Sequence, residues 1–596
     1  MFDAAKALCD ILISHQFTDE NSADHGALLC PAHEKSHTRT GEAVFPLLHL
    51  YSETNEKEYL DAALGLLRWL SRVQKDDGSW ESESCEVEGL ATVSLTLALS
   101  HSYQLPKSPV ADKDRETLVK MIRKGAEYVC DRATSKRLEQ LGPGMGFLAL
   151  SSSALQFAHG VTGEERYRLS ARDNALSAIQ QINEEGFLVG ERPGVPSCHP
   201  YVDVGFSVEI SLGALTVYSC LSGNQEVREA VLKALQTHLN FIVPTGYIDD
   251  SWGTRMDRWT LLGSEEGIGC QVPFLALRNF DARFQRAAGQ NLRFMLKNMM
   301  KDGLVTAGPH AKDSPGYRPC ITPTALRANA LSQTLTYSCG VPLGREGKWI
   351  LPTEEKGWVR FYKSVNVLQV RTSALLCTIT GYGAGAPRLT APSGGAVSHL
   401  WHTRFGTVQA ASAYIPALHD FDEHRPRGWL APRIEALIGD RYFSNLFEPS
   451  AVISFSDKKI ADDKFEVVVT GALKSQDGDD SGLTYAITYC FEGATIAKRI
   501  TVRGLPGASL RIIEPVILEE GCDVLPIQTG IEIRHPHGVS CIVTASGQTT
   551  QIRRASLKDA VWSYLPVLRA LPIVIEPSER GTPTEVSYAL ELRDWE

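Results

Sequence analysis

The chain has 596 residues, enough for two to four domains, and its 43% hydrophobic and 22% charged residues are typical of folded globular proteins. That composition excludes a disordered or fibrous chain. The 60 Lys and Arg against 70 Asp and Glu give a net charge of −10, which argues against nucleic acid as the natural partner.

Nothing in the sequence predicts export or a membrane partner. No apolar run reaches the roughly 18 residues of a spanning helix. The first residues lack a basic start, and Asp3, Asp10 and His15 interrupt the apolar stretch that a signal peptide needs. The 13 cysteines are scattered and odd in number, which is typical of reduced thiols. We therefore expect a cytoplasmic protein.

Residues 1 to about 340 carry the spacing of amphipathic helices. Leu60, Ala63, Leu64 and Leu67, for example, recur at the period of one helix face. Polar turns with an acidic residue just after them mark the helix starts. Helices inferred in this way begin near residues 1, 38, 57, 89, 114, 148, 166, 203, 226, 264, 282 and 322, which makes six helix pairs.

The connections between these helices alternate in length. Short turns lie near Thr54, Gly163, Gly223 and Asp281, whereas long connections lie near 17–37, 75–88, 184–202, 243–263 and 301–321. Repeated helix pairs bury their faces on their neighbours. The alternation predicts an (α/α)6 toroid in which the first helix closes the ring beside the sixth pair. Function is expected in the long loops of such a rigid scaffold.

From about Val365 the pattern changes to strands. Segments such as KFEVVVTGAL and LTYAITYCFEGATIAKRITVRG alternate with period two and are separated by Gly, Asp and Pro. We predict a multidomain α+β protein with the toroid over 1–340, a linker over 341–358 and an antiparallel β-sandwich over 359–596.

The long loops share an unusual composition of Trp, Tyr, Arg, His and carboxylates. Indole faces cover the apolar patches of sugar rings, carboxylates bind hydroxyls, and Arg binds a uronic carboxylate with two hydrogen bonds. The alternative is that each residue caps or stiffens its own loop. The predicted substrate-binding residues are His33, His37, Arg39, Glu42, Asp77, Trp80, Trp252, Arg255, Arg258, Trp259 and Glu265.

The loop around residue 250 is the densest of these and is predicted to carry the chemistry. It places Tyr247, Asp249, Asp250, Trp252 and two arginines within thirteen residues. Because the two aspartates are adjacent, only one is expected to point inward, and an Asx turn is the structural alternative. The predicted catalytic residues are Tyr247, Asp249, Asp250, His199, Tyr201 and His310.

A short segment carries metal-ligand residue types. Cys30, His33 and His37 lie close in sequence, but a structural zinc site needs a fourth ligand, and no second Cys/His pair follows at standard spacing. We therefore predict no metal site and no cofactor, and the sequence leaves open whether Cys30, His33 and His37 bind a metal.

The architecture and several motifs resemble the heparinase II/III-like carbohydrate-active enzymes. The motifs are HGALLCPAHEKSHTRTGEAVFPLLHLYSETNEKEYLDAA, DDGSW, GYIDDSWGTRMDRWTLLGSEEG and GLVTAGPHAKDSPGYRPCITPTA. The resemblance implies a polysaccharide lyase in which a Tyr or His removes the C5 proton of a uronate and protonates the leaving oxygen. An Asn, Gln, Glu, His or Arg neutralises the carboxylate. Similar toroid-plus-sandwich proteins are glycoside hydrolases that release glucuronic acid.

Three functions follow. The first is β-elimination on uronic-acid-containing oligo- or polysaccharides. The second is exo-acting hydrolysis by a carboxylate pair drawn from Asp249 or Asp250, Glu265, Asp77 and Glu42. The third is glycan binding without catalysis. The expected partner is an acidic oligosaccharide or polysaccharide, and the sequence leaves a homo-oligomer open.

Overall fold

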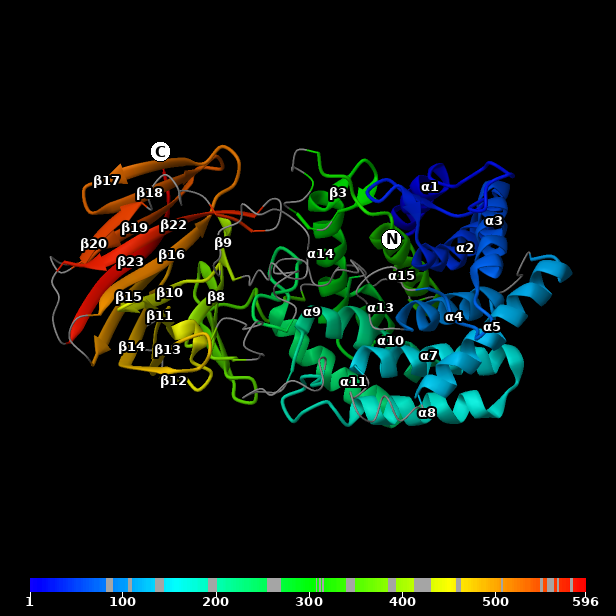
Figure 1. Ribbon diagram of the computed structural model, residues 1–596, viewed down its shortest axis with the longest axis horizontal. Helices are drawn as coiled ribbons and strands as arrows, with labels where there is room; N and C mark the ends of the chain where they lie inside the picture. The colour runs from blue at the N-terminus through cyan, green and yellow to red at the C-terminus, as the bar shows by residue number, and fades with distance from the viewer. Residues whose placement is uncertain are drawn as a thin grey trace. The chain divides into compact units, whose positions relative to one another are not determined.

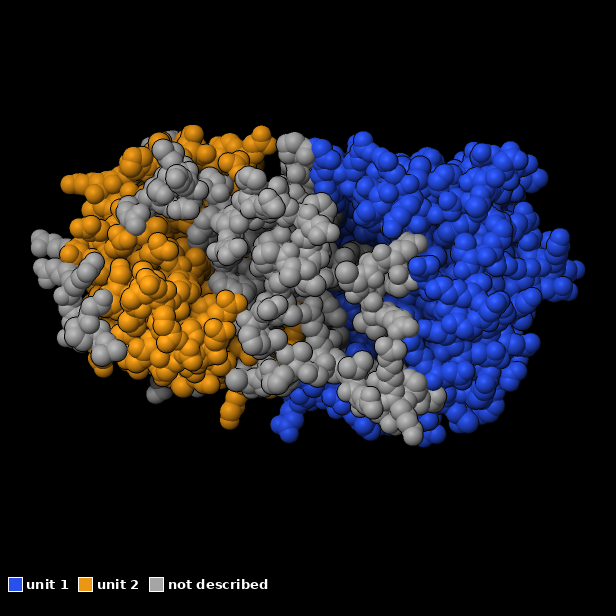
Figure 2. All heavy atoms as spheres, in the orientation of Figure 1, with its two compact units in different colours: residues 1–194, 204–248, 262–351 blue, residues 195–203, 249–261, 352–596 orange. Residues whose placement is uncertain are grey.

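The computed structural model describes residues 1–81, 89–105, 110–133, 144–190, 201–254, 269–306, 308–309, 312, 316–338, 349–383, 393–411, 430–456, 463–504, 508–546, 550–554, 562–564, 568–578 and 583–595. The chain forms two compact units (Figure 2). Unit 1 comprises residues 1–194, 204–248 and 262–351, and unit 2 comprises residues 195–203, 249–261 and 352–596. Two loops that interrupt the helical half of the sequence therefore belong to the unit that contains the strands.

Unit 1 is a closed ring of helix pairs (Figure 1). The inner helices are α2 (Val44–Thr54), α4 (Leu90–Tyr103), α7 (Met145–Thr162), α10 (Leu212–Ser222), α13 (Gln271–Ala276) and α15 (Thr322–Ser338). Their outer partners are α3 (Lys57–Val73), α5 (Asp112–Ala133), α8 (Glu165–Ile179), α11 (Gln225–His238), α14 (Arg283–Asn298) and α1 (Phe2–Ser14). Each inner helix packs on the next, and α15 packs on both α2 and α1. The predicted toroid, closed by the first helix beside the last pair, is confirmed.

Burial explains which helices line the inside. Residues Leu90 to Ser102 of α4 are all buried, as expected of a helix surrounded by other helices. The outer helix α3 buries one face only, including Tyr59, Leu66 and Leu70. The continuous helical segment Val204–Ser222 is long and apolar enough to cross a membrane by composition, but 83% of it is buried inside the protein, as in a core helix.

The short turns end helices as their sequences predict. Gly163 and Gly223, at φ 72° and 70°, follow α7 and α10 in the left-handed conformation that glycine adopts without strain. The side chain of Asn224 then accepts a hydrogen bond from the backbone N–H of Val227 and caps α11. A π-helical segment, η2 (Ser207–Ser211), separates the short α9 (Val204–Phe206) from α10.

Unit 2 is an antiparallel β-sandwich. A five-stranded sheet contains β5 (Trp358–Tyr362), β6 (Val367–Arg371), β7 (Leu375–Thr380), β8 (Ala396–His402) and β9 (Gly406–Ala410) in chain order. The second sheet has fourteen described strands, from β10 (Arg433–Ile438) to β23 (Thr584–Asp594). One hydrophobic core joins the two sheets, with Leu368 and Cys377 from the first and Val467 and Ile487 from the second.

The larger sheet follows the order β17-β18-β19-β23-β15-β14-β13-β11-β10-β16-β22-β20, while β12 pairs with β13 and β21 with β22. In chain order, the strands between β10 and β23 are β11 (Arg441–Ser444), β12 (Val452–Phe455), β13 (Lys464–Lys474), β14 (Asp480–Glu492), β15 (Thr495–Arg503), β16 (Ser509–Ile517), β17 (Asp523–Ile527), β18 (Gly530–His535), β19 (Val539–Ala545), β20 (Thr550–Arg554), β21 (Trp562–Tyr564) and β22 (Leu568–Pro577). Buried residues alternate along β14, as predicted for a sheet with one face on a core.

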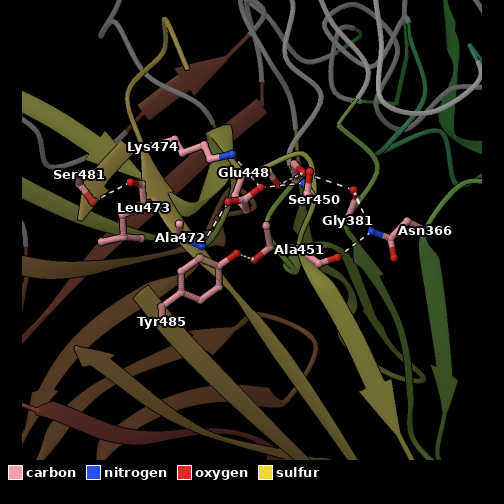
Figure 3. Close-up of polar contacts among 12 residues, drawn as sticks. Asn366, Gly381, Glu448, Ser450, Ala451, Ala472, Leu473, Lys474, Ser481 and Tyr485 are labelled. Atoms are coloured by element: carbon pink, nitrogen blue, oxygen red, sulfur yellow. Dashed lines mark hydrogen bonds and ion pairs between the residues drawn. The ribbon is translucent and has the colours of Figure 1, made fainter. Parts of the chain in front are cut away.

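Polar contacts tie the two sheets together around the buried Glu448 (Figure 3). Its carboxylate accepts hydrogen bonds from the backbone N–H groups of Ser450 and Ala472, at 2.8 and 3.2 Å, and Lys474 Nζ lies 3.3 Å away. Asn366, in the turn between β5 and β6, donates to the carbonyl of Ala451 at 2.9 Å. The Asn366 bond joins the smaller sheet to the segment of the larger sheet that Glu448 holds.

Candidate functional site

Two of the predicted substrate-binding residues lie inside the ring of unit 1. Arg39 and Glu42 come from the 3-10 segment η1 (Thr38–Ala43) that precedes α2, and their side chains are 3.4 Å apart. Asn329 of α15 donates to the other oxygen of Glu42 at 2.9 Å, and Gln333 donates to Asn329 at 3.1 Å. The sequence did not predict a role for either amide, because α15 has no amphipathic pattern that would assign them to the inner face of the ring.

These groups line a cavity of about 60 Å³ together with Glu209 of the π-helical segment. Binding pockets for small molecules are usually about 300–1,000 Å³. The cavity has room for a few water molecules and not for a sugar ring. Arg39 and Glu42 therefore form a buried polar network in the described structure.

A second group of predicted residues lies in unit 2, where the loop around residue 250 meets the five-stranded sheet. Asp249 is 1% exposed. Its Oδ1 accepts hydrogen bonds from the backbone N–H and the hydroxyl of Ser251, at 3.2 and 2.6 Å, which is an Asx turn. Its Oδ2 accepts the hydroxyl of Thr378 on β7 at 2.6 Å and lies 3.8 Å from Nδ1 of His399 on β8. The Asp249 carboxylate therefore both forms the Asx turn and takes part in a buried polar cluster.

His399 was missed in the sequence and is fully buried. Burial lowers the pKa of its imidazole, and the negative charge of Asp249 partly opposes that shift. The imidazole is therefore neutral at neutral pH. A carboxylate near Nδ1 favours the neutral tautomer in which Nδ1 carries the hydrogen.

Two aromatic residues of the same loop and sheet contact each other. Trp252 is fully buried, and its ring meets Tyr382 edge to face at 5.3 Å. The Tyr382 hydroxyl accepts the backbone N–H of Val202 at 2.8 Å, which holds the segment 201–203 on the sheet. Burial raises the pKa of Tyr382, and a negative charge on Tyr201 would raise it further. Tyr201 itself is half-buried. We call Tyr201, Asp249, Asp250, Trp252, Tyr382 and His399 the loop–sheet cluster.

Three other predicted residues make local contacts within the structure. The Tyr247 ring is 4% exposed and packs on Phe294 of α14 at 5.3 Å. Asp77 is exposed and accepts the N–H and hydroxyl of Ser79, which lowers its pKa. Trp80 is 2% exposed, and its indole N–H donates to the carbonyl of Leu70 at 3.0 Å. Trp80 has the environment of a core residue, so we leave it out of the proposed site.

Six predicted residues lie outside the described residues. They are His199, His310, Arg255, Arg258, Trp259 and Glu265. Their predicted roles stay predictions.

His33 and His37 lie together with two thiols in unit 1. The Sγ of Cys30 is 3.3 Å from Nδ1 of His33, which is 3.0 Å from Nε2 of His37. Cys320, two residues before α15, places its Sγ 3.7 Å from that of Cys30. Cys320 is the fourth Cys or His that sequence spacing did not show, because it lies 290 residues away.

The pattern of the whole chain matches one family. Residues 5–347 match the ulvan lyase N-terminal domain, and residues 359–591 match the ulvan lyase C-terminal domain. The chain belongs to the ulvan lyase family. A curated relative, the broad-specificity ulvan lyase of Formosa agariphila, is 25% identical over 472 residues, which cover 76% of this chain and 72% of the relative. The resemblance to heparinase-like lyases is confirmed, and this ulvan lyase family member is a polysaccharide lyase.

Solved structures share its fold. The chondroitin AC lyase of Streptomyces coelicolor A3 superposes with a TM-score of 0.56 at 11% identity, over 99% of this chain and 78% of that one. Heparinase III superposes with a TM-score of 0.53 at 10% identity, over 99% and 85%. These likenesses agree with the toroid and sandwich of the ulvan lyase family member described above.

Proposed function

We propose that this enzyme cleaves ulvan or a closely similar uronic-acid-containing polysaccharide by β-elimination, with the loop–sheet cluster supplying the proton transfer. The observation that carries the substrate is the match of both family domains over nearly the whole chain. The hydrolase alternative has no comparable support, because Asp249 is engaged by Ser251 and Thr378 in the described structure.

In the proposed mechanism His399 is the base. Elimination removes the proton at C5 of the uronate, and the bond from C4 to the leaving oxygen breaks as the C4–C5 double bond forms. The neutral imidazole, whose Nδ1 lies 3.8 Å from the Asp249 carboxylate, accepts the C5 proton. Catalytic hydrogen bonds are often completed only in the substrate complex, so the burial of His399 does not exclude this role.

Tyr201 is proposed as the acid. It is half-buried at the edge of the loop–sheet cluster, and its hydroxyl would donate a proton to the leaving oxygen. We propose positioning roles for Arg39 and Glu42 in place of the predicted substrate binding, because they are 7% and 5% exposed and bound within the ring network.

The test is incubation of the protein with ulvan while absorbance is followed in the ultraviolet band of an unsaturated uronate. A rise with time is expected, and Tyr201→Phe should lower the rate about 10²–10⁴-fold with the fold intact by thermal melting. Release of reducing ends without an absorbance rise would indicate hydrolysis and overturn the proposal. Chondroitin and heparan sulfates in parallel assays define the substrate range.

A cytoplasmic location and an exo-type attack on short imported chains also stay proposals. The location is supported by the ten described cysteines, none of which forms a disulfide. Cell fractionation with an antibody to the protein, and product sizing early in the reaction, test the two statements separately.

A further inference from the structure

The four candidate ligand atoms in unit 1 have the spacing of a tetrahedral metal site. Zinc binds thiolate sulfur at about 2.3 Å and imidazole nitrogen at about 2.0–2.1 Å, so tetrahedral ligand atoms lie about 3.3–3.8 Å from one another. The Sγ atoms of Cys30 and Cys320 are 3.7 Å apart. Nδ1 of His33 lies 3.3 Å from the Cys30 sulfur and 3.0 Å from Nε2 of His37, and all four ligand atoms lie within 4.8 Å of one another.

The backbone around the cluster supports this arrangement. Cys30 ends the strand β1 (Leu29–Cys30), which forms a two-stranded hairpin with β2 (Lys35–Ser36). His33 lies in the turn of this hairpin, where Glu34 adopts φ 54° and donates its backbone N–H to the carbonyl of Cys30 at 2.8 Å. His37 follows β2 directly. One hairpin thereby presents three ligand groups to the same point.

The fourth ligand group is fixed by the start of α15. Cys320 precedes Ile321, whose carbonyl accepts the backbone N–H groups of Thr324 and Ala325 at 3.1 and 3.2 Å. The cluster is also partly shielded, with Cys30 and His37 buried.

We propose that Cys30, His33, His37 and Cys320 bind one structural Zn²⁺ ion. Two thiolates and two imidazoles in a tetrahedral set favour zinc over magnesium or calcium, which prefer oxygen ligands. Four protein ligands leave no open position for substrate or water, so the ion has a structural role and takes no part in elimination.

The position of the site explains what the ion would stabilise. The hairpin follows α1, and Cys320 precedes α15, and these two helices form the pair that closes the ring. An ion bound at this point links segments 290 residues apart and restricts the unfolded chain, as a long-range cross-link does. Zinc would therefore hold the ring closed.

Metal content of the full-length protein, purified without chelators, tests the proposal. Mass spectrometry of the metals should find about one zinc per chain, and Cys320→Ser should lower this several-fold. The matched control Cys220→Ser changes a surface cysteine outside the cluster and should keep one zinc. Zinc contents below about 0.2 per chain in the wild type, or equal contents in both variants, would overturn the proposal.

Cobalt substitution covers the case in which the ligand variant fails to fold. Wild-type protein produced with Co²⁺ should show a sulfur-to-cobalt charge-transfer band and the strong visible bands of tetrahedral cobalt. Absence of these bands, or a Cys30–Cys320 disulfide in non-reducing peptide maps, contradicts zinc binding. Elimination activity separates this proposal from the proposed function, because Cys320→Ser should melt several degrees lower yet retain its turnover at low temperature.

Discussion

Two histidine clusters in this protein differ in what surrounds the imidazole. In unit 1, His33 and His37 face two thiols, and the four ligand atoms converge on one point. In unit 2, His399 faces the carboxylate of Asp249, and the hydroxyl of Thr378 binds the same carboxylate. Sulfur and nitrogen donors arranged around a point suit a metal ion, whereas a single carboxylate beside one ring nitrogen suits proton transfer by the imidazole. The partners of a histidine, more than the histidine itself, indicate its chemistry.

The largest expected effect comes from removing the proposed base. His399→Gln should lower kcat on ulvan about 10²–10⁴-fold while the zinc content stays unchanged. His402→Gln is a matched control on the same strand, because His402 accepts backbone N–H groups of the turn after β8 and lies outside the cluster. Turnover in His399→Gln within threefold of the wild type would show that the loop–sheet cluster does not carry the chemistry.

Replacing Asp249, the carboxylate beside His399, should lower activity less than replacing His399 does. Burial lowers the pKa of His399, and the negative charge of Asp249 partly opposes this effect. Asp249→Asn keeps the size of the side chain but removes that charge. The hydrogen bonds from Ser251 and Thr378 to the charged carboxylate weaken as well, and one such bond is worth about 1.5–3 kcal/mol, so kcat/KM should fall about 10–150-fold.

The pH profile distinguishes this role from a purely structural one. With Asp249 neutral, the pKa of His399 falls further, so the acid limb of the profile should move to lower pH. Thr378→Val, which removes a hydroxyl but no charge, should leave the limb in place. A shift of the limb to higher pH in Asp249→Asn would contradict the proposed pairing.

Buried histidines that lack an acidic neighbour should make stability depend on pH. Burial lowers the pKa of His101 to about 3 and that of His238 to about 4. Below about pH 6.5 the unfolded chain binds protons that the folded chain excludes, so the free energy of unfolding falls as the pH falls. Each group should cost about 2 kcal/mol between pH 7.5 and pH 5.

Denaturant melts at the two pH values measure this loss. His238→Gln cannot be protonated, so the difference between pH 7.5 and pH 5 should shrink by about 2 kcal/mol, whatever the variant's stability at pH 7.5. His159→Gln, near the surface at the end of α7, serves as the control. An unchanged difference in His238→Gln would mean that this histidine is protonated in the folded state.

The parts of the structure that the sequence predicts are those controlled by local pattern. The period of α3 and the turns at Gly163 and Gly223 mark helices wherever they lie in the fold, so the ring could be predicted. The two histidine clusters depend on contacts between distant segments. Every residue of β8 is buried, so its sequence shows no alternation that would single out His399. Cys320 contacts Cys30 across 290 residues of sequence, which no local pattern shows.

The smallest effect should come from Trp80, whose sequence context predicted sugar binding and whose burial indicates a core role. Trp80→Phe loses the hydrogen bond to Leu70 and part of a packed ring, so stability should fall by about 1–2 kcal/mol. Because the indole is 2% exposed, KM for ulvan should stay within twofold of the wild type at temperatures where the variant is folded. Trp349→Phe, at a position 55% exposed, should change neither quantity. A tenfold rise in KM for Trp80→Phe without loss of stability would instead place this indole against the substrate.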